Sequence, residues 1–263
     1  MILCILGRQP ELGLTELESL YPGKVTRFGS EAALVNIDRL DIQNLGGSQK
    51  AARVVYNLYN AKISEISHKI IDSYSKRAIR KDLSKLTIGI SAYNTNIKTT
   101  QIKKIGAAIK FNAKKLGGTV RIIPNNDPIL NTATSHHNKL GLRENKKEII
   151  IIQYNSRTII AESIGAQNIT ALAKRDQTRP KRDAFVGMLP PKLALMMYNM
   201  AIGKSQSILN KKLNQPAILD PFCGTGVILQ EAYLRGAKIY GTDLNPKMVN
   251  YTQQNLTDRK SVV

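Results

Sequence analysis

The chain has 263 residues, enough for two or three domains, and its hydrophobic content of 42% is that of a globular protein. The apolar stretch MILCIL is interrupted by Arg8, which makes it too short for a signal peptide or a membrane span. The two cysteines, Cys4 and Cys223, lie far apart without metal-ligand spacing. We therefore expect no metal site, no membrane association and a reducing, cytoplasmic setting.

Positive charge is concentrated in one part of the chain, whose formal net charge is +20. Residues 1–60 hold six Lys or Arg against six Asp or Glu, whereas residues 61–120 hold thirteen against three. This concentration favours a polyanionic partner. The alternative is a basic surface that only keeps the protein soluble.

Residues 1–60 predict a small α/β unit. MILCILG predicts a strand, LTELESLYPG a short helix ended by Pro22 and Gly23, and AALVNI a second strand. A unit of this size is marginally stable alone, so we expect it to pack against the residues that follow.

Residues 61–165 predict a second α/β module. LTIGISA alternates between apolar and small residues and predicts a half-buried strand, whereas EIIIIQY predicts a buried strand of the same sheet. Between them, a helix is predicted to end at Gly117 and to bury Ile102, Ile105, Ile109 and Leu116. Its cationic residues are expected to face outward: Lys103, Lys104, Lys110, Lys114 and Lys115.

The stretch AKRDQTRPKRD, within residues 166–186, predicts a polar, charge-dense connector. The following GMLPPKLALMMYNMAIG predicts a helix that starts near Pro190 and stops at Gly203. Its predicted apolar face consists of Leu193, Met196, Met197 and Met200.

The stretch AILDPFCGTGVILQEAYLRGAKIYGTD predicts a strand, a turn, a helix and a second strand, the first half of a doubly wound sheet. Gly224 and Gly226 allow a tight turn and a close approach to a ligand. Asp243 lies nineteen residues after Gly224, at the distance where an acidic side chain accepts hydrogen bonds from ribose hydroxyls. The pattern therefore indicates a ligand that carries a nucleoside.

Two further positions narrow the choice of ligand. The third glycine of a dinucleotide fingerprint is replaced by Leu229, which disfavours a nicotinamide cofactor. Asp220, at the end of the first strand, suits an ammonium group better than a pyrophosphate. S-adenosylmethionine combines a ribose, an ammonium and no phosphate, so the pattern favours it as the ligand. The alternative is an ordinary strand-to-helix turn that binds no ligand. Cys223 is interpreted as a small turn residue and not as a nucleophile.

The chain resembles a known family over nearly its whole length. DPFCGTG and GTDLNPKMV are similar to the first two motifs of class I methyltransferases. RDQTRPKRDAFVGMLPPKLALMMYNMA resembles the segment before them in the archaeal and eukaryotic tRNA guanine-10 N2-methyltransferase family. LGRQPELGLTELESLYPG resembles that family's ferredoxin-like module, and LNTATSHHNKLG with EIIII resembles the second half of its THUMP RNA-binding domain.

The resemblance implies an α/β fold in four parts. These are a ferredoxin-like module (1–60), a THUMP-like RNA-binding domain (61–165), a basic connector (166–186) and an incomplete class I, Rossmann-like methyltransferase domain (187–263). It also implies S-adenosylmethionine as the cofactor and tRNA as the partner.

The resemblance assigns roles to individual residues. Asp220, Gly224 and Gly226 would surround the methionine part of the cofactor, Asp243 would hold the ribose and Leu244 would flank the adenine, with Thr225 in the same turn. The cationic helix would bind the tRNA acceptor end, and its phosphates would contact the side chains of Lys103, Lys104, Lys110 and Lys114. Arg175, Arg179 and Arg182 would guide the substrate strand, the alternative being a solvated linker.

One motif of the family is missing from the sequence. The Asp/Asn-Pro-Pro-aromatic segment, which binds the guanine amine and stacks on the flipped base, has no match, so no catalytic residue is assigned. We expect a domain that is incomplete at its C-terminus and poorly stable in the last third of the chain. The tail DRKSVV matches one reading frame of a common sequencing adapter, so we expect residues 258–263 to be non-native, the alternative being a natural C-terminus.

Three interpretations of the function are consistent with these observations. The first is a methyltransferase that uses S-adenosylmethionine to modify the N2 amine of a guanosine in tRNA, although these 263 residues would be inactive alone. The second is a tRNA-binding protein without chemistry. The third keeps the chemistry but moves the target to another guanosine or to ribosomal RNA.

Overall fold

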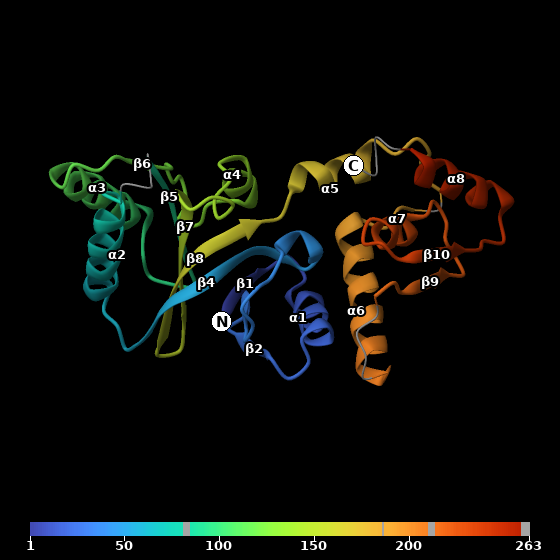
Figure 1. The fold of residues 1–263 in the computed structure, drawn as a ribbon, viewed down its shortest axis with the longest axis horizontal. Coiled ribbons are helices and arrows are strands. Elements are labelled where there is room, and N and C mark those ends of the chain that lie inside the picture. The colour runs from blue at the N-terminus through green and yellow to red at the C-terminus, as the bar shows by residue number, and fades with distance from the viewer. Residues whose placement is uncertain (81–84, 186, 210–213, 259–263) are drawn as a thin grey trace. The chain divides into compact units, whose positions relative to one another are not determined.

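The computed structural model describes residues 1–80, 85–185, 187–209 and 214–258. The fold is α/β, as predicted (Figure 1). Contacts divide the chain into two compact units that do not follow chain order. Unit 1 consists of Met1–Ile5, Thr26–Ile42 and Gln49–Gln167, and unit 2 of Leu6–Val25, Gln43–Ser48 and the residues from Asn168 onward. The four-part division expected from the sequence stays a prediction.

The larger sheet lies mostly in unit 1 and has eight strands in the order β2-β3-β1-β4-β8-β7-β5-β6. The strands are β1 (Ile2–Leu6), β2 (Val25–Phe28), β3 (Ala32–Val35), β4 (Ser48–Tyr59), β5 (Leu86–Tyr93), β6 (Val120–Ile122), β7 (Lys146–Tyr154) and β8 (Arg157–Ala166). β5 pairs in parallel with β6 and β7, whereas β8 pairs antiparallel with β7 and β4. A short 3-10 helix, η1 (Ile42–Asn44), precedes β4.

Helices α2 (Ile63–Arg77) and α3 (Thr99–Lys115) pack side by side against one face of this sheet (Figure 1). Ile149 and Ile151 of β7 face the core beneath these helices, and the alternate residues Ile150 and Ile152 face a second core. β7 is therefore buried on both faces, as its continuous apolar run predicts.

The prediction that residues 86–92 form a half-buried strand is wrong, because all eight residues of β5 are buried. One face packs under α2 and α3, and a Cβ at Gly89 on the other face would meet Leu130 and Leu140. Buried Ser91 remains satisfied because its Oγ donates to Glu148 Oε1 at 2.6 Å. The small polar residues of the pattern thus fill a second buried face.

Unit 1 contains a buried polar cluster that includes Ser135 of the short helix α4 (Thr132–His137). Lys50 Nζ donates to Glu148 Oε1 and to the carbonyl of Leu130, and Ser135 Oγ donates to Glu148 Oε2. The Lys50 and Glu148 side chains are 2% and 1% exposed. Burial lowers the pKa of Lys50, and the neighbouring Glu148 opposes that shift.

Unit 2 holds most of the remaining elements. These are α1 (Pro10–Leu20), α5 (Ile169–Gln177), α6 (Pro191–Leu209), β9 (Ala217–Asp220), α7 (Val227–Tyr233), β10 (Lys238–Gly241) and α8 (Pro246–Thr257). Part of the predicted connector thus forms helix α5. Asp258 follows α8, and the rest of the tail predicted to be non-native lies outside the described residues.

Helix α1 packs against α6 within unit 2. The buried Glu16 of α1 accepts hydrogen bonds from Gly46 N, Gly47 N and Asn199 Nδ2, all at 2.7–2.8 Å. A Cβ at Gly203 would lie 2.2 Å from the carbonyl oxygen of Ser19, so only glycine permits this close approach. An N-terminal helix thus forms part of the unit that carries the glycine-rich turn.

Two details predicted for α6 are wrong. The helix continues past Gly203 to Leu209, because that glycine serves close packing against α1 rather than termination. Met197 is 42% exposed, whereas Leu195 and Tyr198 occupy the buried face. In α3, likewise, Leu116 lies just beyond the helix end and is 50% exposed, and Ala113 is buried.

Candidate functional site

The candidate site lies at the carboxyl ends of two parallel strands. β9 and β10 pair in register, with Asp220 opposite Gly241, and Asp243 follows two residues after β10. Ile218 and Ile239 pack against the core formed with α6 and α7, which covers one face of the two-stranded sheet. The carboxylates of Asp220 and Asp243 therefore follow neighbouring strands at the same edge, where open α/β sheets bind their ligands.

The turn after β9 is shaped by two glycines. Gly224 (φ +53°) and Gly226 (φ +82°) both have left-handed backbone conformations, which favour glycine. Gly224 N donates to Asp243 Oδ2 at 2.9 Å, and a Cβ at Gly224 would meet nothing within 4 Å. Asp243 thus fixes the turn, and the Gly224 backbone borders open space.

The two carboxylates interact electrostatically. Burial raises the pKa of Asp220 and the nearby charge of Asp243 raises it further, while the hydrogen bond from Phe222 N opposes the shift. Asp243 Oδ1 accepts a hydrogen bond from Asn245 N at 2.9 Å. Because each carboxylate oxygen can accept more than one hydrogen bond, Asp243 retains acceptor capacity for ligand hydroxyls.

Cys223 is buried at the base of the turn. Burial raises the pKa of its thiol, and the charges of Asp220 and Asp243 act in the same direction. A raised pKa disfavours the nucleophilic thiolate. This agrees with the interpretation of Cys223 as a small turn residue.

Two residues of α8 that were not predicted from the sequence donate hydrogen bonds to the glycine-rich turn. Thr252 Oγ1 of α8 donates to the carbonyl of Gly224 at 2.8 Å, and Asn255 Nδ2 donates to the carbonyl of Thr225 at 2.9 Å. A Cβ at Gly226 would lie 2.8 Å from Thr252 Cγ2. No sequence signal marks these two polar residues, because their role depends on where α8 packs.

The other predicted cofactor residues differ in exposure. Leu244 is 97% exposed beside Asp243, whereas Thr225 is 5% exposed. Phe222, which was not among the predicted residues, is 80% exposed in the turn. Leu244 and Phe222 are therefore accessible apolar groups that follow Asp243 and Asp220 closely in the sequence.

The predicted RNA-binding lysines belong to unit 1. Lys103, Lys104, Lys110 and Lys114 are all exposed on α3, and that helix contains no acidic residue. The sheet-facing side of α3 is apolar and buried. The outer face of α3 is thus cationic along its length.

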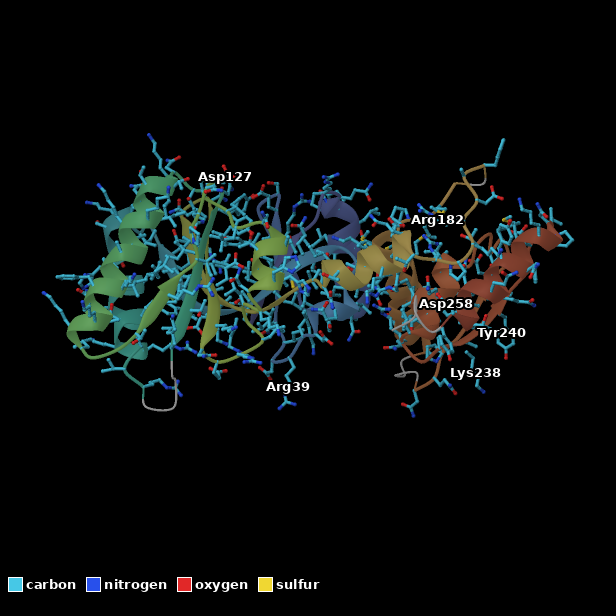
Figure 2. All side chains as sticks on the ribbon, turned by 90° about the horizontal axis from the view of Figure 1, so that it is seen from above. Arg39, Asp127, Arg182, Lys238, Tyr240 and Asp258 are labelled. Atoms are coloured by element: carbon cyan, nitrogen blue, oxygen red, sulfur yellow. The ribbon has the colours of Figure 1, made fainter. Side chains whose placement is uncertain are left out.

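The three predicted arginines have different surroundings. Arg175 Nε donates to the buried Glu231 at 2.6 Å, and its side chain is 14% exposed. The Arg179 side chain is fully buried beside Asp176, and burial lowers its pKa. Arg182 is exposed in the connector (Figure 2). Of these three, Arg182 alone is presented to solvent.

The described part of the chain has neither a metal-ligand cluster nor a helix that could span a membrane. Within it, no group of three or more His, Cys, Asp or Glu side chains could hold a metal ion. No helix among the same residues is both long and apolar enough to cross a membrane.

Curated proteins with similar sequences are named as tRNA methyltransferases. The chain is 41% identical over 83 residues to a tRNA (guanine(10)-N2)-dimethyltransferase of Methanothermobacter thermautotrophicus, which is 31% of this chain and 22% of that protein. It is 43% identical over 72 residues to the protein of the same name from Methanocaldococcus jannaschii, 27% of this chain and 18% of that protein. A probable tRNA (guanine(10)-N2)-dimethyltransferase of Methanothermococcus thermolithotrophicus is 40% identical over 65 residues, 25% of this chain and 35% of that protein.

These matches confirm, over the matched segments, the resemblance to the tRNA guanine-10 N2-methyltransferase family. The chain matches between about a fifth and a third of the length of these relatives. No family model matches the chain.

Solved structures show a more distant likeness. TrmN from Thermus thermophilus is 13% identical with a TM-score of 0.48, and the match covers 100% of this chain and 71% of that one. A 4-thiouridine synthetase in complex with RNA and ATP is 11% identical with a TM-score of 0.42, over 93% of this chain and 53% of that one. Both TM-scores lie below 0.5.

Proposed function

We propose that the chain carries the tRNA-binding and cofactor-binding parts of an S-adenosylmethionine-dependent methyltransferase that acts on the N2 amine of a guanosine in tRNA. The observation that carries the proposal is the arrangement of Asp220, Gly224 and Asp243 at the ends of two parallel strands. The relatives that match at about 40% identity, all named as tRNA guanine-N2 dimethyltransferases, support the choice of substrate.

The chemistry of the site fits this cofactor. Its ammonium and sulfonium are cationic, and the site offers two carboxylates, Asp220 and Asp243. Burial raises the pKa of Asp220 and the charge of Asp243 raises it further, so a positive ligand beside them is favoured. Asp243 would accept hydrogen bonds from the ribose hydroxyls, and the open space beside Gly224 would admit the methionine part. Thr225 would contribute backbone to this turn, and exposed Leu244 would flank the adenine. When bound, the cofactor supplies an electrophilic methyl group.

The cationic face of α3 would bind the phosphates of tRNA. Lys103, Lys104, Lys110 and Lys114 would position the RNA without reading its sequence. Arg182 would add a contact near the substrate strand, since its side chain is exposed. Arg175 and Arg179 would act indirectly, because Glu231 and Asp176 already hold their guanidinium groups. A cytoplasmic setting is part of this proposal, because tRNA is the proposed partner.

Calorimetric titration with S-adenosylmethionine tests the cofactor site. We expect saturable binding to the full chain and its loss in Asp243→Ala, which removes the ribose acceptor and the bond to Gly224 N. Glu18→Gln is the matched control, because it removes one exposed carboxylate from α1 in the same unit. Equal binding by both variants would contradict the proposed site.

Salt-dependent tRNA binding tests the α3 surface separately. Replacing Lys103, Lys104, Lys110 and Lys114 together with Ala is expected to reduce the slope of log K against log salt by about 3, since each phosphate contact releases counterions. Lys204→Ala with Lys238→Ala is the control, because both lysines are exposed elsewhere. An unchanged slope would mean that the RNA binds another surface.

We further propose that these 263 residues bind both partners without transferring a methyl group. The sequence contains no Asp/Asn-Pro-Pro-aromatic segment to bind the guanine amine. An assay of labelled methyl transfer to tRNA is expected to show none, and measurable transfer would refute this part. The alternative hypothesis is a tRNA-binding protein without catalytic activity. Tight tRNA binding without cofactor binding would favour it.

A further inference from the structure

The cationic face of α3 also carries an exposed aromatic ring. Phe111 is 59% exposed although it lies on a helix whose opposite side is fully packed. The ammonium of Lys115 lies 4.4 Å from the centroid of its ring. Single exposed apolar side chains are common on protein surfaces, so the informative feature is the combination of this ring with the surrounding lysines.

The helical spacing places this ring within a row of cations. Lys104, Phe111 and Lys115 are seven and four residues apart, so they lie along one stripe of the helix. Between Lys104 and Phe111 the stripe carries only small residues, Ala107 and Ala108. The Lys115 ammonium lies over one face of the ring, so a base would stack on the opposite face.

This combination matches the parts of a single-stranded nucleotide segment. A phenyl ring offers a stacking surface to any unstacked base, and flanking ammoniums attract phosphates. The bases of a continuous duplex are already stacked on one another, so they would leave such a ring unused. A surface with lysines alone would bind duplex and single-stranded RNA through phosphates without distinguishing them.

We propose that Phe111 is a stacking platform for one unpaired base of the bound RNA, with Lys104 and Lys115 holding the adjacent phosphates. This inference rests on the proposed RNA-binding function of α3 and narrows its substrate to RNA with an unpaired segment. The positive charge of the helix, without any acidic residue, argues for a polyanion as the occupant.

Fluorescence anisotropy with two labelled RNA hairpins of equal phosphate number tests the proposal. One hairpin is blunt, and the other has a single-stranded 3′ end that contains 2-aminopurine. Phe111→Ala is expected to weaken binding of the hairpin with the overhang by about 5- to 150-fold, the range for loss of one base–aromatic stack. Binding of the blunt hairpin is expected to stay within about two-fold, because its phosphate contacts remain.

Three further variants separate stacking from other effects. Phe111→Trp is expected to retain tight binding and to quench 2-aminopurine, whereas Phe111→Leu is expected to bind as weakly as Phe111→Ala, since it keeps apolar area but loses the ring. Leu116→Ala is the matched control, because Leu116 is an exposed apolar residue just beyond the same helix. Phe111 is exposed, so circular dichroism is expected to show unchanged folding in all these variants.

The outcomes that overturn the proposal are distinct. Equal losses for both hairpins, no loss with Phe111→Ala, or full binding by Phe111→Leu would each exclude a stacking platform while leaving RNA binding by α3 intact. If the unaltered chain binds neither hairpin, the proposed RNA-binding function fails as well. Phe111-dependent sedimentation with phosphatidylserine vesicles, without any hairpin preference, would assign this surface to an anionic membrane instead.

Discussion

Strands β5 and β9 show how differently the two units secure their sheets. All eight residues of β5 are buried between β6 and β7 and between two layers of side chains. In β9 only alternate residues are even partly buried, and Leu219 is 64% exposed beside its partner Tyr240, which is 58% exposed. Figure 2 shows Lys238 and Tyr240 projecting from β10. One sheet is thus fixed by burial, and the other is covered on one face.

The contrast indicates what holds the candidate cofactor site in place. Because apolar burial around β9 and β10 is limited to the α6 and α7 side, specific hydrogen bonds must position the turn. Gly224 N donates one of these bonds to Asp243, and Thr252 and Asn255 of α8 donate the others to carbonyls of the turn. We therefore expect unit 1 to tolerate changes on the exposed cationic face of α3 and unit 2 to depend on a few polar contacts.

The largest effect is expected in the buried cluster of unit 1. Glu148→Ala would leave the Lys50 ammonium buried without its partner, which costs about 3–5 kcal/mol in the free energy of unfolding. Hydrogen exchange in urea, followed by mass spectrometry, would show the loss in peptides of β5 and β7. Glu144→Ala is the control, since its 70% exposed side chain should contribute at most about 1 kcal/mol. Equal effects of the two variants would contradict the importance of burial in this unit.

A smaller effect is expected where α1 packs against α6 in unit 2. Gly203→Ala would drive a methyl group into the Ser19 carbonyl, and overpacking of this kind costs about 1–3 kcal/mol. Faster exchange is expected in α1 and α6 but not in β5 and β7. Ser207→Ala, at an exposed position of the same helix, should change little. Unaltered exchange in α1 after Gly203→Ala would show that this contact is not needed.

At the candidate site, stability and binding should move in opposite directions. The pKa of Asp220 is raised by burial and by Asp243, so the folded state holds its proton more tightly than the unfolded state does. Its contribution to stability therefore falls as pH rises from the unfolded to the folded pKa. Asp220→Asn should make unit 2 more stable than the unaltered chain at neutral pH, equal it at low pH, and weaken cofactor binding. A lower free energy of unfolding for the variant than for the unaltered chain at neutral pH would contradict this.

The smallest effect is expected on the exposed face of β9 and β10. Leu219→Ser should change the free energy of unfolding by no more than about 0.5 kcal/mol, as for other exposed positions. The same variant should reduce binding of the dye ANS, which reports accessible apolar surface. Ile218→Ser, on the packed face of the same strand, should destabilise unit 2 clearly. Similar costs at both positions would mean that the Leu219 side is also covered in solution.

The parts predicted correctly from sequence depend on local pattern. The strand, turn, helix and strand around Asp220, Gly224 and Asp243 are encoded within 27 consecutive residues, from Ala217 to Asp243, by apolar runs and glycines. The apolar face of α3 was likewise predicted from its period, apart from Leu116. Short-range information was sufficient for both.

The parts that could not be predicted depend on distant partners. The burial of Ser91 follows from its bond to Glu148, and the helical position of Gly203 follows from its contact with Ser19. Thr252 and Asn255 acquire their role only because α8 packs beside the turn. Arg175 was predicted as an RNA contact, but its bond to Glu231 depends on tertiary packing that the sequence pattern does not show.

The most direct test is a calorimetric titration of the full chain with S-adenosylmethionine, with tRNA binding measured on the same preparation. We predict saturable cofactor binding at one site per chain that disappears in Asp243→Ala while tRNA binding is retained. If the unaltered chain binds tRNA but gives no binding signal with the cofactor, the turn at Gly224 is no cofactor site and the methyltransferase proposal is contradicted.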